Sequence, residues 1–277
     1  MHDHIYFDQQ KTIERIVALD SYFKTRVMES NRFTCSNFSA CRKSHLGTFY
    51  QGQLHHIGSY YDAYLNNRPF RIIVVGQEYG HEPSFVSLSA RRQMVLNQTG
   101  LHKTFPQRNP HMRGTTSALR LLFGLPLSVD HASEYLQSNS ERCHLFDAFA
   151  LVNYLLCSAV QEGEGRSGKA TETMLKACQR HFRKAVEILE PTVMVVQSKG
   201  FWDWVKRSFD RVTKLSDELY QTHLGENQTF VAVFAHPSTP DNPHNWGRSA
   251  NTTYLLDTVA PTLYKIREIT LSDTMHS

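Results

Sequence analysis

Residues 71–85 read RIIVVGQEYGHEPSF, and the rest of the chain is organised around this stretch. Ile72 to Val75 form an apolar, mostly β-branched run, which predicts a short strand buried on both faces of a parallel sheet. Gly76 ends the run, and the next six residues carry an amide, two carboxylates, a phenol and an imidazole. Because ligands bind beyond the carboxyl ends of strands in open parallel sheets, we expect chemistry here, with an ordinary polar loop as the alternative.

Three further apolar runs predict strands, and amphipathic or capped segments between them predict helices. The predicted strands are Arg71–Val75, His144–Asn153 with its exit loop, Thr192–Val196 and Thr229–Ala235. The predicted helices are Lys11–Met28, Tyr60–Leu65 as a short turn, Thr115–Phe123, Asp130–Gln137, Thr171–Leu189, Phe201–Arg211 and Ser249–Lys265. This alternation predicts an α/β fold, a three-layer α/β/α sandwich with a central four-stranded parallel sheet.

The length of 277 residues fits a single domain, with residues 1–65 as an N-terminal helix and cysteine-bearing segment ahead of a core at 66–277. The formal charge of +4 permits a nucleic-acid partner without requiring one. The sequence has no apolar run long enough to span a bilayer, and its first residues, MHDHIYFDQQ, lack the pattern of a secretory signal. We therefore expect a monomeric, cytoplasmic protein without a membrane partner, whose cysteines are not paired as disulfides.

Polar side chains follow three of the four predicted strands. Gln77 and Glu78 follow the first strand, Asn153 ends the second, and His236 and Ser238 follow the fourth. Parallel strands end at the same edge of a sheet, so a carboxylate, an amide and an imidazole should converge on one pocket. Each also has a simpler interpretation, as a solvated side chain, a helix cap or a turn residue.

Several segments, in this order, resemble motifs of the uracil-DNA glycosylase superfamily. Gly76-Gln77-Glu78-Tyr79-Gly80-His81 resembles its first motif, which is GQDPYH in enzymes without a cluster and GEAPG in the iron–sulfur enzymes. His236-Pro237-Ser238 resembles its second motif, HPS. Residues 153–157, NYLLC, are similar to the TNVVKC segment of the iron–sulfur branch, and 175–178 with 185–191 resemble its AC-helix-RP segment. The resemblance runs from Cys35 to Pro261 and implies a DNA glycosylase.

The cysteines are similar to those of the iron–sulfur branch, which holds a [4Fe–4S] cluster on two pairs of thiolates. The four matching residues are Cys35, Cys41, Cys157 and Cys178. The resemblance therefore implies a [4Fe–4S] cofactor here, while structural zinc and free thiols are the alternatives. The first pair departs from the branch because it reads C-x5-C rather than C-x2-C. The fifth cysteine, Cys143, is predicted to lie in the core.

The resemblance also implies a mechanism in which the nucleotide is extruded and the bond between sugar and base is hydrolysed. Glu78 stands at the place of the catalytic aspartate of the cluster-free enzymes and would orient water and stabilise the cationic sugar. His236 would donate a hydrogen bond to O2 of the departing base, and Asn153 would read the pyrimidine edge. The iron–sulfur branch has alanine where Glu78 stands, so Glu82 is the reserve candidate for orienting water.

The same resemblance suggests residues that bind the base and the DNA backbone. The substrate-binding candidates are Gln77, Tyr79, Gly80, His81, Phe85 and Ser238, with Tyr79 or Phe85 stacking on the base or gating it. The phosphate-binding candidates are Arg113, Ser198, Lys199 and Arg248. The stretch from His81 to Arg113 is longer than the matching loop of uracil-removing relatives, which indicates either a pocket for a bulkier base or a neutral insertion.

The sequence thus predicts a monofunctional DNA glycosylase that removes uracil or a modified cytosine and leaves an abasic site. Some superfamily members act against phage DNA that carries glucosylated hydroxymethylcytosine, and the long loop is the feature that points to them. Two other classes are retained as alternatives: a catalytically inactive, cluster-bearing DNA-binding protein of this fold, and an unrelated zinc- or cluster-dependent hydrolase.

Overall fold

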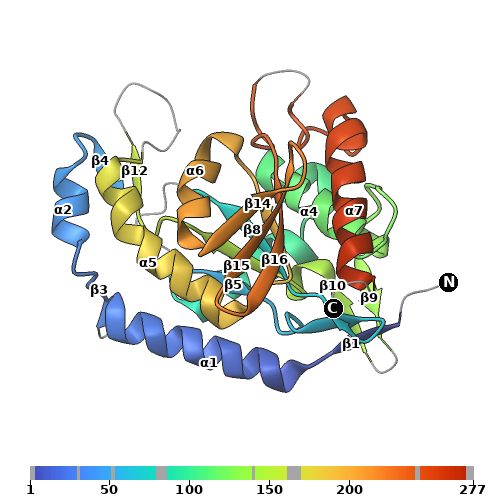
Figure 1. Cartoon of the computed structure of the whole chain (residues 1–277), viewed down its shortest axis with the longest axis horizontal. Coiled ribbons are helices and arrows are strands. Elements are labelled where there is room, and N and C mark those ends of the chain that lie inside the picture. Colours follow the sequence, from blue (N-terminus) through green and yellow to red (C-terminus); the bar gives the residue numbers. More distant parts are fainter. Residues whose placement is uncertain are drawn as a thin grey trace.

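The computed structural model describes residues 4–29, 32–50, 54–78, 86–138, 141–160, 170–240 and 244–272. Their centre is a mixed seven-stranded sheet of order β14-β15-β16-β13-β8-β11-β5 (Figure 1). In that order, its strands are Arg211–Lys214, Leu219–Leu224, Asn227–Val233, Val193–Val196, Ile72–Gly76, Ala150–Asn153 and His56–Ile57. The protein is therefore a mixed α/β structure.

The four strands at the middle of the sheet are the four that the sequence predicts. β16, β13, β8 and β11 run parallel to their neighbours, whereas β5, β15 and β14 add antiparallel edges. The expectation of a four-stranded sheet was therefore too narrow. The sequence did not predict β14 and β15 because neither forms a continuous apolar run. Arg211–Lys214 is largely exposed, and Leu219–Leu224 mixes polar with apolar residues.

Helices pack on both faces of the sheet because side chains alternate along each buried strand. Ile73 and Val75 of β8 join one apolar core, while Ile72 and Val74 join another. The first core includes α1, α5 and α6, and the second includes α4 and α7 (Figure 1). The helices are α1 (Gln9–Arg26), α2 (Phe38–Lys43), α3 (Leu88–Gln93), α4 (Pro110–Leu122), α5 (Glu172–Leu189), α6 (Trp202–Val205) and α7 (Ala260–Leu271).

Shorter elements complete the chain. The π-helical segments are η1 (Met94–Leu101) and η7 (Leu255–Val259). The 3-10 turns are η2 (Phe105–Gln107), η3 (His131–Ser133), η4 (Leu145–Asp147), η5 (Lys199–Phe201) and η6 (Lys206–Ser208). The smaller strands are β1 (Ile5–Phe7), β2 (Met28–Glu29), β3 (Arg32–Phe33), β4 (Thr48–Tyr50), β6 (Ala63–Leu65), β7 (Arg68–Pro69), β9 (Tyr135–Gln137), β10 (Arg142–His144) and β12 (Ser158–Val160). Within the described ranges, no helix is long and apolar enough to cross a membrane.

Helix α4 begins five residues earlier than predicted, and this shift matters for the site. Asn109 is its N-cap and accepts a hydrogen bond from the Met112 amide at 2.9 Å, while Pro110 occupies the first helical position. An Asn-Pro pair is a common way to begin a helix, because the side chain caps it and proline lacks only an unused N–H. Thr116 lies in the helix interior, where its hydroxyl donates to the Met112 carbonyl.

Three predicted helical segments were wrong or too long. Residues 63–65 of the predicted turn form β6, which pairs with β1 and, through a turn at Asn66 and Asn67, with β7. Both asparagines have positive φ, as a tight hairpin turn requires. Residues 130–137 contain only a 3-10 turn and β9, which pairs with β10. The predicted helix at 201–211 is reduced to α6 between two 3-10 turns.

Candidate active site

A cavity of about 430 Å³ lies where β8, β11 and β16 end. Its lining includes Glu78, Asn153, His236 and Ser238, so the structure brings the three predicted catalytic side chains to one place. Other lining residues come from η1 and the start of α4, which lie within the stretch from His81 to Arg113 that the sequence analysis linked to a larger pocket or a neutral insertion. π-Helical segments such as η1 occur frequently at functional sites.

Gly76 leaves room for two of the polar side chains. It is the parallel-sheet partner of Asn153, and a Cβ atom at residue 76 would lie 3.2 Å from Asn153 Oδ1 and 3.3 Å from His111 Nε2. Both distances are tighter than most real Cβ contacts. Glycine at this position therefore lets an amide and an imidazole approach the end of the same strand.

Glu78 is a half-buried side chain with a buried carboxyl oxygen, and its pKa is raised toward neutral pH. The Ala159 backbone amide donates to it, but Oε2 is buried without a hydrogen-bond partner among the residues that the structure covers. Burial outweighs the amide and raises the pKa of Glu78 to about 7. A carboxyl with such a pKa can take up or release a proton at physiological pH, which is the property of a general base or acid.

His236 presents a defined tautomer. Its Nδ1 atom accepts the Ser238 backbone N–H at 3.2 Å and lies 2.8 Å from Ser238 Oγ. Since a backbone N–H can only donate, the neutral ring must carry its proton on Nε2. Desolvation lowers the pKa of His236, although the residue is partly exposed at the open side of the cavity. The ring is therefore a neutral N–H donor at neutral pH.

Pro237 packs the segment from His236 to Ser238 against α4. A Cβ atom on Gly114 would lie 2.8 Å from Pro237 Cγ, and one on Gly247 would lie 2.8 Å from Pro237 Cβ and 2.1 Å from the Pro110 carbonyl oxygen. The Gly247 amide also donates to the Pro237 carbonyl at 3.0 Å. Gly114 and Gly247 thus leave the space that Pro237 occupies, and this packing positions the neighbouring His236.

His111, near the start of α4, is one of the cavity residues that the sequence analysis did not name as a site residue. Its ring centroid lies 5.9 Å from that of His236. Burial, with smaller contributions from His236 and Arg91, lowers the pKa of His111 to about 3, so the ring is neutral. The Asn109-Pro110 pair could have marked the helix start, but no sequence signal says that this end of the helix faces the cavity.

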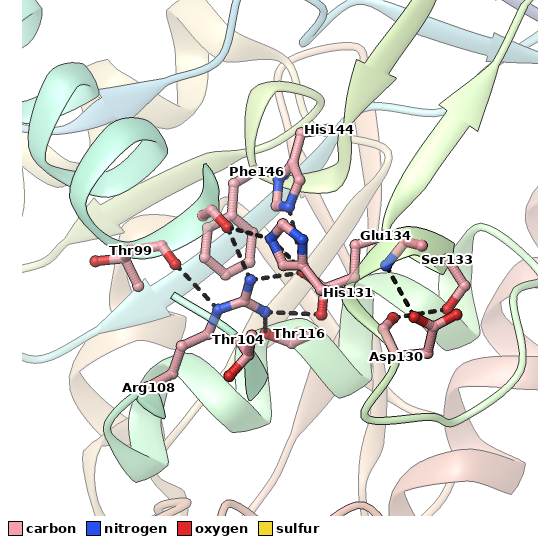
Figure 2. A network of polar contacts seen from close by, with 12 residues as sticks. Thr99, Thr104, Arg108, Thr116, Asp130, His131, Ser133, Glu134, His144 and Phe146 are labelled. Carbon is pink, nitrogen blue, oxygen red and sulfur yellow. Dashed lines mark hydrogen bonds and ion pairs between the residues drawn. The ribbon is translucent and has the colours of Figure 1, made fainter. Parts of the chain in front are cut away.

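A buried ion-pair network supports the wall of the cavity (Figure 2). The Arg108 guanidinium contacts both carboxylate oxygens of Glu134, at 2.9 and 2.6 Å, and both side chains are fully buried. Arg108 also donates to the carbonyls of Thr99, at 3.1 Å, and Gly100, at 3.0 Å. Because Thr99 lines the cavity, the network fixes the end of η1 there.

Glu134 also lies close to His131 and His144, and the ligand atoms of these three residues are within 4.8 Å of one another. Hydrogen bonding argues against a metal ion there. His144 Nδ1 accepts the Phe146 amide, so its Nε2–H points at Glu134, 3.2 Å away. His131 Nε2 lies 2.9 Å from the Gly100 carbonyl and must therefore carry a proton as well. Burial alone would raise the pKa of Glu134, but His144 and Arg108 lower it to about 2.

A second, small apolar cavity gathers four of the five cysteines. Its lining includes Cys35, Cys41, Cys157 and Cys178, together with His181. Burial raises the pKa of Cys178 to about 12, so its thiol stays protonated unless a cation displaces the proton. Cys143 is buried elsewhere, in the other apolar core, as predicted.

The spacing of these sulfur atoms bears on what they can bind. Among the residues described, the cysteines do not form a group of three ligands as compact as His131, Glu134 and His144. A single zinc ion needs such a compact group, whereas each thiolate of a [4Fe–4S] cluster binds a different iron and stands farther from the others. The four thiols thus line one apolar cavity but, among the described residues, do not form a compact site for a single ion.

Residues 153–159 connect the two cavities through their backbone amides. The Tyr154 and Leu155 amides donate to the carbonyls of Gly76 and Gln77, at 3.0 and 2.9 Å. The Leu156 amide donates to the Cys178 sulfur, and the Ala159 amide donates to Glu78. One short segment thus contacts both sites and carries Cys157 itself.

Some predicted site residues are not among those that line the large cavity. Tyr79, Gly80, His81, Glu82 and Phe85 lie outside the described residues. Gln77, Arg113, Ser198, Lys199 and Arg248 are described but do not line it. Lys199 forms an ion pair with Glu218 at 2.8 Å, and this carboxylate would compete with a phosphate for the Lys199 ammonium group.

Comparisons with known proteins give no identification. No model of a known protein family matches the chain, and no curated protein is significantly similar to it. The two cavities and the motifs that line them are therefore the basis for assigning a function.

Proposed function

We propose that the protein is a monofunctional DNA glycosylase that hydrolyses the bond between deoxyribose and a non-standard pyrimidine. The observation that carries this proposal is the meeting of Glu78, Asn153 and His236 in one cavity, at the ends of three parallel strands. The four parallel strands, with helices on both faces, would be the α/β/α core of such an enzyme.

The protonation states suit the chemistry. Ionised Glu78 would accept a proton from water as the water oxygen bonds to C1′ and the C1′–N1 bond breaks, and its charge would stabilise the cationic sugar. The departing base takes the bonding electrons as an anion, and His236 Nε2–H would donate to its O2. Asn153 would pair with the base edge through its amide, which has both a donor and an acceptor.

The cavity volume bears on the choice of base. About 430 Å³ is within the range of pockets that hold drug-sized ligands, and side chains such as Glu78, His111 and Asn153 make its wall polar. A bare pyrimidine, with eight non-hydrogen atoms in uracil, does not need that much space. This favours a cytosine with a polar substituent, such as hydroxymethylcytosine or its glucosylated form, as a second candidate substrate.

The activity is tested by offering the protein DNA that contains uracil, hydroxymethylcytosine or glucosylated hydroxymethylcytosine, and then cleaving abasic sites with alkali. Glu78→Gln and His236→Ala should each reduce the single-turnover rate on the order of a hundredfold while DNA binding survives. The exposed Glu226, at the turn between β15 and β16, provides Glu226→Gln as a matched control. Release of no base, with Glu78→Gln changing nothing, would instead indicate a DNA-binding protein that has lost catalysis.

We further propose that Cys35, Cys41, Cys157 and Cys178 hold a [4Fe–4S] cluster, which supplies structural support beside the site. The purified protein should then be brown and contain iron and sulfide. Serine at any of the four positions should remove the colour, whereas Cys143→Ser should keep it, because Cys143 lies in the other core. A colourless protein with one bound zinc would contradict the proposal.

A further inference from the structure

His111 has the position and the free hydrogen-bonding groups of a residue that contacts the substrate. Its Nε2 and Asn153 Oδ1 both lie within about 3.3 Å of the same point above Gly76 Cα. In the described part of the chain, neither ring nitrogen of His111 has a hydrogen-bond partner, although its backbone carbonyl accepts from Thr115 Oγ1. The imidazole therefore offers its polar atoms to whatever fills the cavity.

We propose that His111 is a specificity-determining residue, which hydrogen-bonds the extruded pyrimidine on the same edge that Asn153 reads. This inference rests on the proposed glycosylase function. The shared approach to Gly76 places the two side chains together, and the ring of His236 stands 5.9 Å from that of His111. If His236 meets O2, then Asn153 and His111 are left for N3 and the group at C4.

The tautomer of His111 determines which groups it accepts. A neutral imidazole has one N–H donor and one acceptor nitrogen, and a partner on one nitrogen fixes the role of the other. His236 is fixed in this way by Ser238, whereas His111 has no such partner among the described residues. His111 can therefore present N–H to the 4-oxo group of uracil or its lone pair to the 4-amino group of a cytosine. His111 would thus contact whichever group stands at C4, and the preference it confers is for a base that carries such a group over one that lacks it.

The test combines a variant that lacks the imidazole nitrogens of His111 with a base that lacks the group they would contact. His111→Phe keeps an aromatic ring but removes both nitrogens, and 2-pyrimidinone in DNA lacks any group at C4. His111→Phe should slow release of uracil on the order of tenfold but change release of 2-pyrimidinone less than twofold, because a lost hydrogen bond costs rate only where it was made. His111→Gln, which restores a donor and an acceptor, should recover part of the uracil rate. His223→Phe, on strand β15 and away from the cavity lining, is the matched control.

An equal loss on both bases would overturn the assignment and leave His111 as a packing residue. A binding assay separates this failure from failure of the proposed function. It uses 2′-fluoro nucleotides of the same two bases, which resist cleavage. If no base is released but the wild type binds the uracil analogue more tightly and His111→Phe abolishes that preference, His111 is a base-contacting residue and catalysis is what fails. If the wild type shows no preference between the analogues, the inference is refuted.

Discussion

Glu78→Gln should make the protein more stable at alkaline pH while it removes activity. The substitution keeps the size of the side chain but cannot ionise. In the wild type, burial raises the pKa of Glu78 from an ordinary 4.5 to about 7. Below pH 4.5 the carboxyl is protonated in the folded and unfolded chain alike. Between pH 4.5 and 7 only the unfolded chain ionises, so stability is lost as the pH rises, and above pH 7 the whole cost is present.

The size of the effect follows from the pKa. One pKa unit corresponds to about 1.4 kcal/mol, so the rise to about 7 costs the wild type about 3 kcal/mol at pH 8.5 as an upper bound. At pH 5 the same calculation leaves less than about 1 kcal/mol. For a domain of this size, about 3 kcal/mol corresponds to a melting temperature higher by about 5–10 °C in Glu78→Gln.

Thermal unfolding of Glu78→Gln and the wild type, at the same scan rate and at pH 5 and pH 8.5, measures the difference directly. Glu226→Gln removes a charge at an exposed position and should shift the melting temperature little at either pH. A stabilisation of equal size at both pH values, or none at pH 8.5, would refute the argument that Glu78 is a buried carboxyl held protonated near neutral pH. This experiment does not depend on which base the protein releases.

Three further predictions concern the supports of the site and the DNA-binding face. Arg108→Met should cost about 3–5 kcal/mol in urea unfolding, because it leaves Glu134 charged and buried, and a loss under 1 kcal/mol would contradict this. Gly114→Ala should displace Pro237 and reduce the single-turnover rate on the order of tenfold. Gly200→Ala, whose added Cβ atom would meet no atom within 4 Å, should leave the rate unchanged. Equal rates for Gly114→Ala and the wild type would show that the two glycines do not position His236. Arg113→Ala and Arg248→Ala should each weaken DNA binding and reduce its salt slope by about one, and unchanged slopes would move the binding face elsewhere.

The strands that carry the site were predictable because each is a continuous apolar run. Ile72–Val75, Val193–Val196 and the strand around Val231 are buried on both faces, which is the pattern that a central parallel strand imposes on a sequence. The hairpin β14–β15 lacks that pattern because β14 is largely exposed and β15 mixes polar with apolar residues, and the buried β5 is too short, at two residues, to form a recognisable run. The helix at 130–137 was expected from local propensity, but pairing of Tyr135–Gln137 with β10 overrides it.

The convergence of Glu78, Asn153 and His236 followed from topology alone, since all three stand at the ends of parallel strands. His111 could not be found in this way, because it comes from a helix that approaches the sheet edge from the side. The sequence alone could not predict the pKa values of these carboxyl groups either. Glu78 and Glu134 are the same residue type, yet burial raises the pKa of Glu78, whereas His144 and Arg108 lower that of Glu134 despite its burial.

The segment from Asn153 to Ala159 connects the two cavities through direct contacts at both. Asn153 at one end lines the large cavity, and the Ala159 amide at the other end donates to Glu78. Between them, the Leu156 amide donates to the Cys178 sulfur, and Cys157 lines the small cavity. A change in the positions of the four thiols would therefore also be felt at Asn153 and Glu78. Under the proposed function, an oxidant that modifies these thiols or a chelator that removes their iron would disturb Glu78 and Asn153 through this segment without entering the large cavity.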